Sequence, residues 1–516
     1  MIAKIIVDNK SKQVDKPFDY LVPKELEGKI KIGSRVLVPF SSGNREIEGF
    51  CVGTADTSGS KRLKSIIRTA NDTVGFDEDM LELIEWMHKK YLASYLDIIH
   101  TIVPSGTALK TKEWIILENK SEEKSEIRRR IAEILTDNGG SMEFKALKEM
   151  CGVDIQNQVR AMIKEGTLKK EYRQSVDIKD KKIKCVKLIC DRETALESAE
   201  ILRRKAPVQA KMLEVLSENE YVSLADLQKF TNGSHSTVKA LEKKNLVNVF
   251  DMTVERDPYW NRVFEKTEKM VPTPEQEYAI YEITNSVKSG DGGIYLLHGV
   301  TGSGKTEVFM QTIENVINMG KSAIMLVPEI SLTPQMVSRF MSRFGGRVAI
   351  FHSGLSAGER YDQWKKIRDG EADIVIGARS AIFTPLKNIG VIIMDEEHSD
   401  TYKSDMSPRY HARETAIFRA SQFGAAVVLA SATPSVESYY KAQTGEYKLL
   451  EMNTRYNKNK MPEISVIDMR SELEKGNKSM LSGKLYNEIE ENLKRGEQTI
   501  LFLNRRGFST FVSCRS

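Results

Sequence analysis

A glycine-rich segment that ends in a lysine and a hydroxyl could bind the phosphates of a nucleotide. It lies between the apolar run IYLLH and the helix-like run TEVFMQTIENVI, and its residues are Gly299, Val300, Thr301, Gly302, Ser303, Gly304, Lys305 and Thr306. Glycines allow backbone N–H groups to face phosphate oxygens, and the start of a helix adds positive partial charge. The spacing G-x-x-x-x-G-K-[ST] therefore predicts an ATP site, with Lys305 on the β and γ phosphates and Thr306 on Mg²⁺.

An acidic cluster, Asp395-Glu396-Glu397-His398, follows the apolar run VIIM. A carboxylate at a strand end beside a phosphate loop suits Mg²⁺, so we expect Asp395 to hold the metal. Glu396 is then placed to orient or deprotonate the attacking water. Two alternatives stay open: the acidic residues could cap the next helix, and His398 could be a structural histidine.

Small hydroxyls follow a third apolar run, in the segment Ser431-Ala-Thr433-Pro. Ser431 and Thr433 could hydrogen-bond the acidic cluster and report the nucleotide state, which would couple the two together with His398. The order is more specific than any one motif, because 90 residues separate Lys305 from Asp395 and 36 separate Asp395 from Ser431. Kinases and small GTPases share only the first element.

The runs around these motifs predict an α/β multidomain protein. Over residues 268–450, short continuous apolar runs alternate with amphipathic segments, which is typical of a RecA-like parallel sheet covered on both faces. Residues 460–516 begin a further β/α pattern with SVIDM and QTILFLNRRG, as if a second lobe started there.

The preceding 260 residues read differently. Residues 1–105 show strand-like alternation, and 77–92 carry apolar residues on one helical face. Residues 110–260 contain a weak repeat of helices followed by an extended stretch, the order of a winged helix. Two copies are expected; they could contact DNA or serve only as packing modules.

Composition excludes several classes of protein. Of 516 residues, 40% are hydrophobic and 29% charged, with 77 Lys and Arg against 72 Asp and Glu for a net charge of +5. Such a chain reads as an ordinary globular protein, and bulk charge does not argue for nucleic acid. No apolar stretch approaches a membrane span. Five scattered cysteines disfavour a disulfide framework, so we expect a reducing cytoplasm and no membrane partner.

The combined motifs are GVTGSGKTEV, LVPEISLTPQ, FHSGLSAGER, IGARSAIFTP, MDEEH and SATPS. Together they resemble those of superfamily-two DNA helicases, and more closely those of the PriA family, the replication restart helicases also called primosomal protein N-prime. The resemblance implies an ATP-dependent 3′–5′ DNA helicase, using ATP and Mg²⁺, that recognises stalled or abandoned forks and initiates primosome assembly. Forked and single-stranded DNA, restart and primosome proteins and single-strand-binding protein are the implied partners. Gln276 would read adenine.

The segment DTYKSDMSPRYHARETA, residues 400–416, resembles the family's aromatic-rich loop, which senses single-stranded DNA. Tyr402, Tyr410 and His411 offer faces on which bases stack, and Lys403, Arg409 and Arg413 offer partners for phosphate. The alternative is a solvated loop with ordinary surface aromatics.

The segments PFDYLVP and RVLVPF are similar to the family's 3′-end-binding domain, placed at residues 1–105. By this match Phe18 and Asp19 line the pocket for a terminal nucleotide, and Lys64 meets phosphate. Asp19 could accept a hydrogen bond from a terminal 3′-hydroxyl. Ser41 stands where the family usually has glycine, and Phe18 and Asp19 could instead form only a turn between strands.

Family members continue with a zinc-binding segment and a complete second helicase lobe. Cys514 lies where the first zinc ligand is expected, and NRRG, residues 504–507, resembles the first motif of lobe two. We therefore expect zinc only in a full-length protein and no ATP turnover by these residues alone. Two alternatives to the restart helicase are a RecG-like branched-DNA translocase and a fork-binding scaffold without catalysis.

Overall fold

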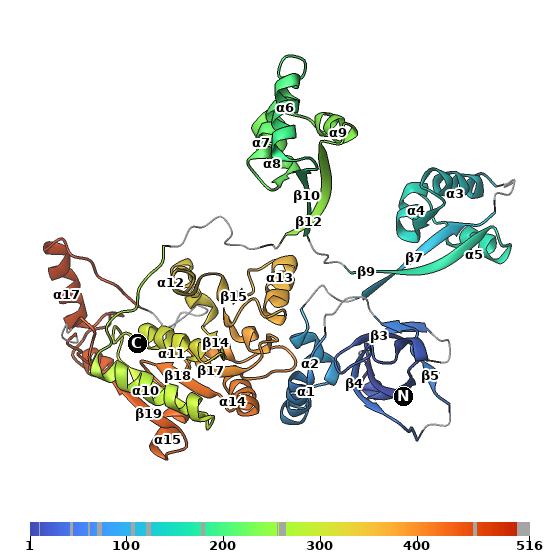
Figure 1. Ribbon diagram of the computed structural model, residues 1–516. Helices are drawn as coiled ribbons and strands as arrows, with labels where there is room; N and C mark the ends of the chain where they lie inside the picture. Colours follow the sequence, from blue (N-terminus) through green and yellow to red (C-terminus); the bar gives the residue numbers. More distant parts are fainter. Residues whose placement is uncertain are drawn as a thin grey trace. The chain divides into compact units, whose positions relative to one another are not determined.

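A computed structural model of the 516-residue chain is shown in Figure 1. It describes residues 1–9, 11–41, 45–59, 62–69, 75–104, 109–119, 125–176, 181–254, 256, 265–457 and 462–502. The chain divides into two compact units, Met1–Tyr456 and Asn457–Ser516.

Six strands near the N-terminus form one sheet in the order β5-β2-β1-β4-β3-β6. They are β1 (Ile2–Val7), β2 (Phe18–Leu21), β3 (Arg35–Phe40), β4 (Arg45–Ala55), β5 (Lys64–Ser65) and β6 (Arg68–Thr69). Alternate residues of the central strands, such as Ile5 in β1 and Val36 in β3, point into a shared apolar core. The prediction of a β-rich N-terminal region is confirmed.

Two helices follow this sheet, α1 (Glu78–Tyr91) and α2 (Tyr95–Ile102). The side chain of Asp77 accepts a hydrogen bond from the Met80 amide and so caps the start of α1. The buried side of α1 packs on the later α/β region, where the Trp86 ring stacks on the Phe418 ring with centroids 4.6 Å apart. The helices therefore join the N-terminal sheet to the later α/β region.

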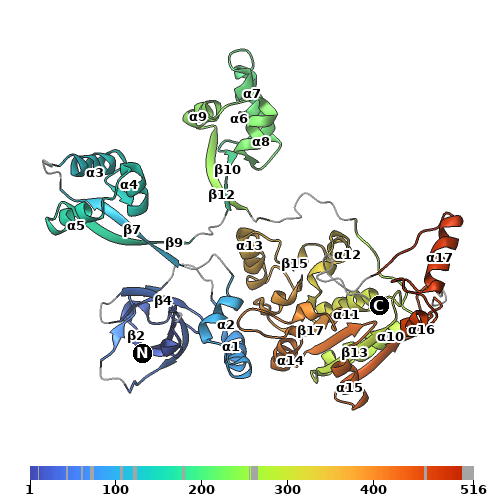
Figure 2. The same ribbon diagram turned by 180° about the vertical axis from the view of Figure 1, so that it is seen from behind.

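Two small modules come next, and their elements follow a common order. The first contains β7 (Leu109–Leu117), α3 (Glu126–Asp137), β8 (Ser141–Glu143), α4 (Phe144–Cys151), α5 (Gln156–Lys164) and β9 (Leu168–Val176). The second contains β10 (Lys181–Leu188), α6 (Arg192–Leu202), α7 (Pro207–Ser217), β11 (Val222–Ser223), α8 (Leu224–Thr231), α9 (His235–Lys243) and β12 (Val247–Val254). In each, a three-stranded antiparallel sheet carries the helices, in the order β8-β7-β9 or β11-β10-β12. The long ribbon of β10 and β12 is visible in Figures 1 and 2. This arrangement is that of a winged helix.

The remainder of the first unit is built on a seven-stranded parallel sheet in the order β15-β16-β14-β17-β18-β13-β19. The strands are β13 (Gly293–Gly299), β14 (Ser322–Leu326), β15 (Val348–Phe351), β16 (Ile374–Gly377), β17 (Ile389–Met394), β18 (Ala426–Ser431) and β19 (Lys448–Met452). Most of their residues are buried, which explains the continuous apolar runs of the sequence.

Helices cover both faces of this sheet (Figure 1). On one face lie α10 (Pro274–Ser289), α11 (Lys305–Asn318) and α12 (Pro334–Phe344), and on the other α13 (Ala357–Arg368), α14 (Ala412–Phe423) and α15 (Val436–Gln443). Successive strand residues divide between the two cores, as Leu296 and Leu297 do. The predicted RecA-like parallel sheet is confirmed. Among the described residues, no helix combines the length and the apolar character needed to cross a membrane.

The described part of the second unit contains α16 (Met469–Glu474) and α17 (Gly483–Lys494) and no strand. The expected strands around SVIDM and QTIL are therefore not formed there. Val466 and Ile500 are largely exposed, so these extended segments have neither a pairing strand nor an apolar layer to stabilise them.

Candidate functional site

Three adjacent strands bring the predicted nucleotide motifs to one edge of the parallel sheet. Strand β18 lies between β17 and β13, and the register places Met394 beside Leu429 and Ser431 beside His298. Parallel strands end on the same side, so the phosphate loop after β13, the acidic cluster after β17 and Ser431 at the end of β18 converge. This edge is where open α/β sheets bind ligands.

The phosphate loop takes a backbone conformation that requires glycine. Gly302 and Gly304 have φ values of +82° and +87°, and α11 begins at the next residue, Lys305. A Cβ on Gly304 would lie 2.3 Å from Nε2 of Gln276, so a side chain there would displace Gln276. Between the strand and these glycines, Val300 is partly buried and Thr301 lies in an exposed turn. The loop therefore presents its backbone, and the N-terminus of α11, to an anion.

Lys305 lies over this loop, and its Nζ donates to the Gly299 carbonyl at 2.7 Å. Burial lowers the pKa of the Lys305 ammonium, whereas the nearby carboxylates of Glu396 and Asp395 act in the opposite direction. Two observations fit a phosphate ligand: the cation lies beside the glycine cradle, and the buried Ser303 hydroxyl has no hydrogen-bond partner among the described residues. Thr306, partly buried in the first turn of α11, completes the motif.

Asp395 and Glu396 lie next to one another just beyond β17. Burial, and then the adjacent Glu396 charge, raise the pKa of Asp395 to about 6. The Glu396 amide donates to Asp395 Oδ1 at 3.0 Å, and Glu396 has a φ of +46°, which is uncommon for a residue other than glycine. Strained backbone of this kind concentrates at functional sites, where it re-aims a side chain.

The donor set at this edge fits Mg²⁺ in its usual mode of binding. Mg²⁺ takes oxygen ligands and is generally held by one or two carboxylates together with substrate phosphates and waters. Asp395 and the Thr306 hydroxyl would hold the ion against the phosphates. A cation would also offset the cost of ionising the partly buried Asp395.

The predicted contact between the acidic cluster and the small hydroxyls is present. His398 Nδ1 lies 2.8 Å from the Ser431 hydroxyl, and that hydroxyl also accepts from the Thr433 amide at 2.9 Å. Nδ1 of His398 is also 3.6 Å from Glu396 Oε2. One histidine thus touches both the residue expected to act on water and the end of β18.

The structure places Gln276 differently from the prediction that it reads adenine. Its side chain is 1% exposed, and Nε2 donates to the Ser303 carbonyl of the phosphate loop at 2.7 Å. Oε1 accepts from the Thr273 amide at 2.9 Å in a capping box at the start of α10. Gln276 therefore braces the loop from behind.

The aromatic residues of the 400–416 segment also need correction. Tyr402 and Tyr410 are buried, so neither ring is available for a base to stack on. The Tyr402 hydroxyl donates to the Asp395 carbonyl at 2.6 Å, and the Tyr410 ring packs edge-on against Phe383. A tyrosine ring is large and apolar apart from its hydroxyl, so burying these two rings in the core stabilises the fold more than exposing them would.

The cations of this segment divide into two groups. Lys403 and Arg409 are exposed, and the Lys403 ammonium donates to the Arg409 carbonyl and lies over the Tyr91 ring. Arg413 instead makes a buried ion pair, with Nη1 donating to Glu397 Oε2 at 3.1 Å. His411 is partly buried and caps the start of α14, where its Nδ1 accepts from the Arg413 amide at 3.2 Å.

Glu397 is a site residue that the sequence reasoning missed. Its carboxylate is 2% exposed and accepts hydrogen bonds from the Ser435 amide, the Ser438 hydroxyl and Arg413. It thereby ties the acidic cluster to α15 and to α14. The sequence does contain a signal for this role, because two glutamates follow one another in DEEH. If the second one points inward, its carboxylate needs a buried partner.

The predicted DNA-end residues gather around a pocket of about 540 Å³ in the N-terminal sheet. Phe18, Asp19 and Lys64 line it together with Lys4 and Phe40. The Phe18 and Phe40 rings meet edge to face at 5.5 Å, and Lys64 Nζ donates to the Ser41 carbonyl at 2.6 Å. Ser41 has a φ of +63°, the left-handed conformation that suits glycine, so the departure from the family's residue keeps the glycine-like backbone.

Asp19 is held by two neighbours inside this pocket. The Ser58 hydroxyl donates to Oδ2 at 2.6 Å and Lys4 Nζ to Oδ1 at 3.3 Å. The hydrogen bond from Ser58 is the main cause that lowers the pKa of the Asp19 carboxyl; burial acts in the opposite direction, and Lys4 lowers the pKa further. The group therefore stays ionised and accepts hydrogen bonds. Cys514 and the NRRG segment lie outside the described residues, and their roles stay predictions.

Comparison with known proteins matches both ends of the first unit. The family model for the PriA 3′DNA-binding domain matches residues 4–104, and the model for DEAD/DEAH box helicases matches residues 273–442. A solved structure of RecG bound to a three-way DNA junction is similar at 23% identity, with a TM-score of 0.30, over 44% of this chain and 29% of that chain.

Curated relatives align along the whole sequence. The replication restart protein PriA of Bacillus subtilis is 41% identical over 99% of this chain and 63% of its own length. The PriA of Synechocystis is 34% identical over 100% of this chain and 62% of its own length. The chain thus spans about three fifths of these relatives. With a PriA 3′DNA-binding domain at one end and a helicase lobe at the other, the chain belongs to the PriA family.

Proposed function

We propose that the chain supplies the DNA-end domain and the ATP-binding lobe of an ATP-dependent 3′–5′ DNA helicase. In this proposal the whole protein recognises stalled or abandoned replication forks and initiates primosome assembly, in contact with restart proteins and single-strand-binding protein. The observation that carries the catalytic part is the convergence of Lys305, Asp395 and Glu396 at one sheet edge.

Each of these residues has a distinct task in the proposed reaction. Lys305 contacts the β and γ phosphates, while Thr306 and Asp395 hold Mg²⁺ against them. Glu396 accepts the proton of the attacking water. Phosphoryl transfer depends mainly on positioning and on charge stabilisation, so a precise cradle matters more than a reactive side chain.

The DNA-binding part of the proposal rests on two surfaces. The pocket around Phe18 and Asp19 would receive a strand end, with the Asp19 carboxylate accepting from the 3′-hydroxyl. The exposed Lys403 and Arg409 would contact phosphates of single-stranded DNA next to the acidic cluster. His398 and Ser431 would couple such binding to Glu396.

The test measures DNA-stimulated phosphate release and nucleotide binding by the full-length protein. Lys305→Ala should abolish both, and Glu396→Gln should retain ATP binding but lose turnover, because an amide cannot accept the proton. Lys288→Ala and Glu371→Gln, at exposed positions away from the sheet edge, are matched controls. Normal turnover by either site variant would refute the assignment.

The same assay separates the alternatives. A wild-type protein that binds forks and never hydrolyses ATP would be a scaffold. A protein that hydrolyses ATP on branched DNA but ignores the presence of a 3′-hydroxyl would favour the RecG-like alternative.

A further inference from the structure

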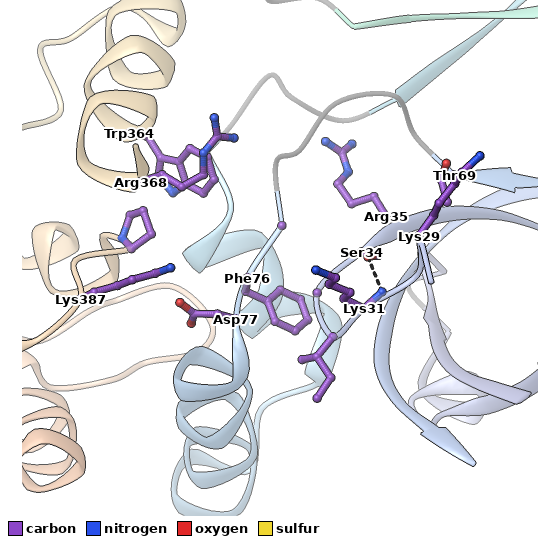
Figure 3. Close-up of a pocket in the computed structure, with 14 residues that line it drawn as sticks. Lys29, Lys31, Ser34, Arg35, Thr69, Phe76, Asp77, Trp364, Arg368 and Lys387 are labelled. Carbon is purple, nitrogen blue, oxygen red and sulfur yellow. Dashed lines mark hydrogen bonds between the residues drawn. The ribbon is translucent and has the colours of Figure 1, made fainter. Parts of the chain in front are cut away.

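A second pocket, of about 360 Å³, lies where the N-terminal sheet meets the nucleotide-binding lobe (Figure 3). One wall is the turn that leads into β3, and another is the start of α1. The third comes from the lobe, with Trp364 and Arg368 of α13 and Lys387 just before β17. It is separate from both sites described above.

Positive charge dominates the lining of this pocket. Its cationic residues are Lys29, Lys31, Arg35, Arg368 and Lys387, contributed by both the N-terminal sheet and the lobe. Asp77 is the only carboxylate among the described residues that line it, and its side chain is engaged in capping α1. The three lysine ammonium groups have no ion-pair or hydrogen-bond partner within the described part of the chain.

Arg35 provides an independent sign that a ligand belongs here. It is 3% exposed, and its Nε donates to Glu48 Oε1 at 2.5 Å in a buried ion pair. Its Nη1 is buried and has no acceptor among the described residues. An unsatisfied buried donor costs free energy, more so on a charged group, and this donor lies in the wall of a cationic pocket without an acceptor from the described residues.

The floor of the pocket is fixed by a close approach of two backbone segments. A Cβ on Gly33, whose φ is +75°, would lie 1.6 Å from the Phe76 carbonyl oxygen, and a Cβ on Gly75 would lie 2.2 Å from the Gly33 oxygen. Arg368 stacks its guanidinium over the Trp364 ring at 5.3 Å. Arg35 and Arg368 are thus held by packed neighbours, which limits the entropy that these two side chains would lose on binding.

The position of the pocket relative to the DNA-end pocket favours a nucleic-acid strand. Arg35 begins β3 and Phe40 ends it, so the two pockets lie at opposite ends of one strand. Five residue steps of about 3.3 Å place them roughly 17 Å apart. A stacked nucleic-acid strand rises about 3.4 Å per nucleotide, so a strand of about five nucleotides or more would connect them.

We propose that this pocket binds a backbone phosphate of a nucleic-acid strand whose end lies in the Phe18 pocket. The proposal rests on the proposed DNA binding and adds a contact shared by the N-terminal sheet and the lobe. A strand bound there would contact the N-terminal sheet and the lobe at once. Its release would therefore require the loss of its contacts with the lysines of both.

The test uses the double variant Lys31→Ala/Lys387→Ala, which removes one exposed cation from each wall and leaves the Arg35–Glu48 pair intact. Lys89→Ala/Lys288→Ala removes the same charge from exposed positions outside the pocket and is the matched control. Affinity for a labelled fork is measured from low to moderate salt in the full-length protein. The slope of log affinity against log salt should become shallower by about one for each phosphate that the variant no longer neutralises.

The outcomes separate the sources of phosphate and the two proposals. If the slope of log affinity against log salt were equal for the pocket variant and the control, with DNA binding intact, the proposed phosphate binding in this pocket would be overturned. The proposed function would be unaffected. Absence of DNA binding by the wild-type protein would overturn both. In a Lys305→Ala background, mononucleotide binding that depends on Lys31 and Lys387 would identify a free-nucleotide site and overturn the strand assignment. A shallower slope without that dependence supports the proposal.

Discussion

The Tyr91 hydroxyl, at the end of α1, donates to Glu414 Oε2 at 2.9 Å, in the first turn of α14. The same hydroxyl accepts from the His411 amide at 3.4 Å. Two residues beyond His411, Arg413 pairs with Glu397 of the acidic cluster. Helix α1 of the N-terminal region is therefore hydrogen-bonded to the segment that contains Arg413, the ion-pair partner of Glu397.

Tyr91→Phe tests whether this contact transmits DNA binding to the ATP site. The variant loses a hydrogen bond to a partly exposed carboxylate, about 0.5–1.5 kcal/mol. We expect DNA-stimulated ATP turnover to fall several-fold while turnover without DNA stays unchanged. Tyr95→Phe is the control, because the described residues offer its hydroxyl no hydrogen bond. If DNA stimulated ATP turnover equally in the two variants, the Tyr91 hydroxyl would have no part in transmitting DNA binding to the ATP site.

Gln276→Glu tests whether the residue braces the loop or reads a base. The new carboxylate would face the Ser303 carbonyl in a buried site, where it cannot donate. We expect the affinities for ATP and GTP to fall together, by about tenfold or more, since a buried hydrogen bond becomes a repulsion. A selective loss of ATP binding, measured by titration with each nucleotide, would restore the adenine role.

Asp19→Ala tests the DNA-end pocket. Because Asp19 stays ionised, it is a strong acceptor for a hydroxyl, and its removal should cost about 1.5–3 kcal/mol, or roughly tenfold or more in affinity. The loss should appear on forks with a free 3′-hydroxyl at the junction and be small on forks blocked by a 3′-phosphate. Equal losses on both forks would mean that Asp19 serves only to stabilise β2.

Asp395→Asn tests the electrostatic cost of the metal site in Mg²⁺-free buffer. Its folded pKa of about 6 exceeds the ordinary value of 3.8, so the folded state binds the proton more tightly than the unfolded chain does. Stability is therefore lost as the pH rises from about 4 to about 6, and the loss is complete above that range. The shift corresponds to about 3 kcal/mol.

The asparagine variant cannot ionise and should escape this loss. Its free energy of unfolding should exceed that of the wild type by up to about 3 kcal/mol at pH 7.5, with a smaller difference at pH 5. Asp405→Asn, at an exposed position, is the control. Denaturant unfolding at both pH values measures the difference, and a gap that widened toward acid would contradict the sign.

Local features of the sequence predicted the phosphate loop well. Gly302, Gly304 and Lys305 are neighbours in the chain, and their geometry follows from positive φ angles and a helix start. The burial of Tyr402 and the Arg413–Glu397 pair depend on residues brought together only by the fold. An aromatic or charged residue in a loop gives the same sequence signal whether it faces solvent or the core. The sequence alone could therefore not show that Tyr402 and Arg413 face inward, and their assignments to DNA were wrong.

The packing of α1 against α14 also has a consequence for how the gene product can be divided. Trp86 stacks on Phe418, and Gln422 Nε2 donates to the Asp79 carbonyl at 2.9 Å, so cutting the chain between the two parts leaves these contacts available. Two co-expressed polypeptides should then assemble into one particle by complementation in trans. Either half expressed by itself would expose that apolar seam and aggregate.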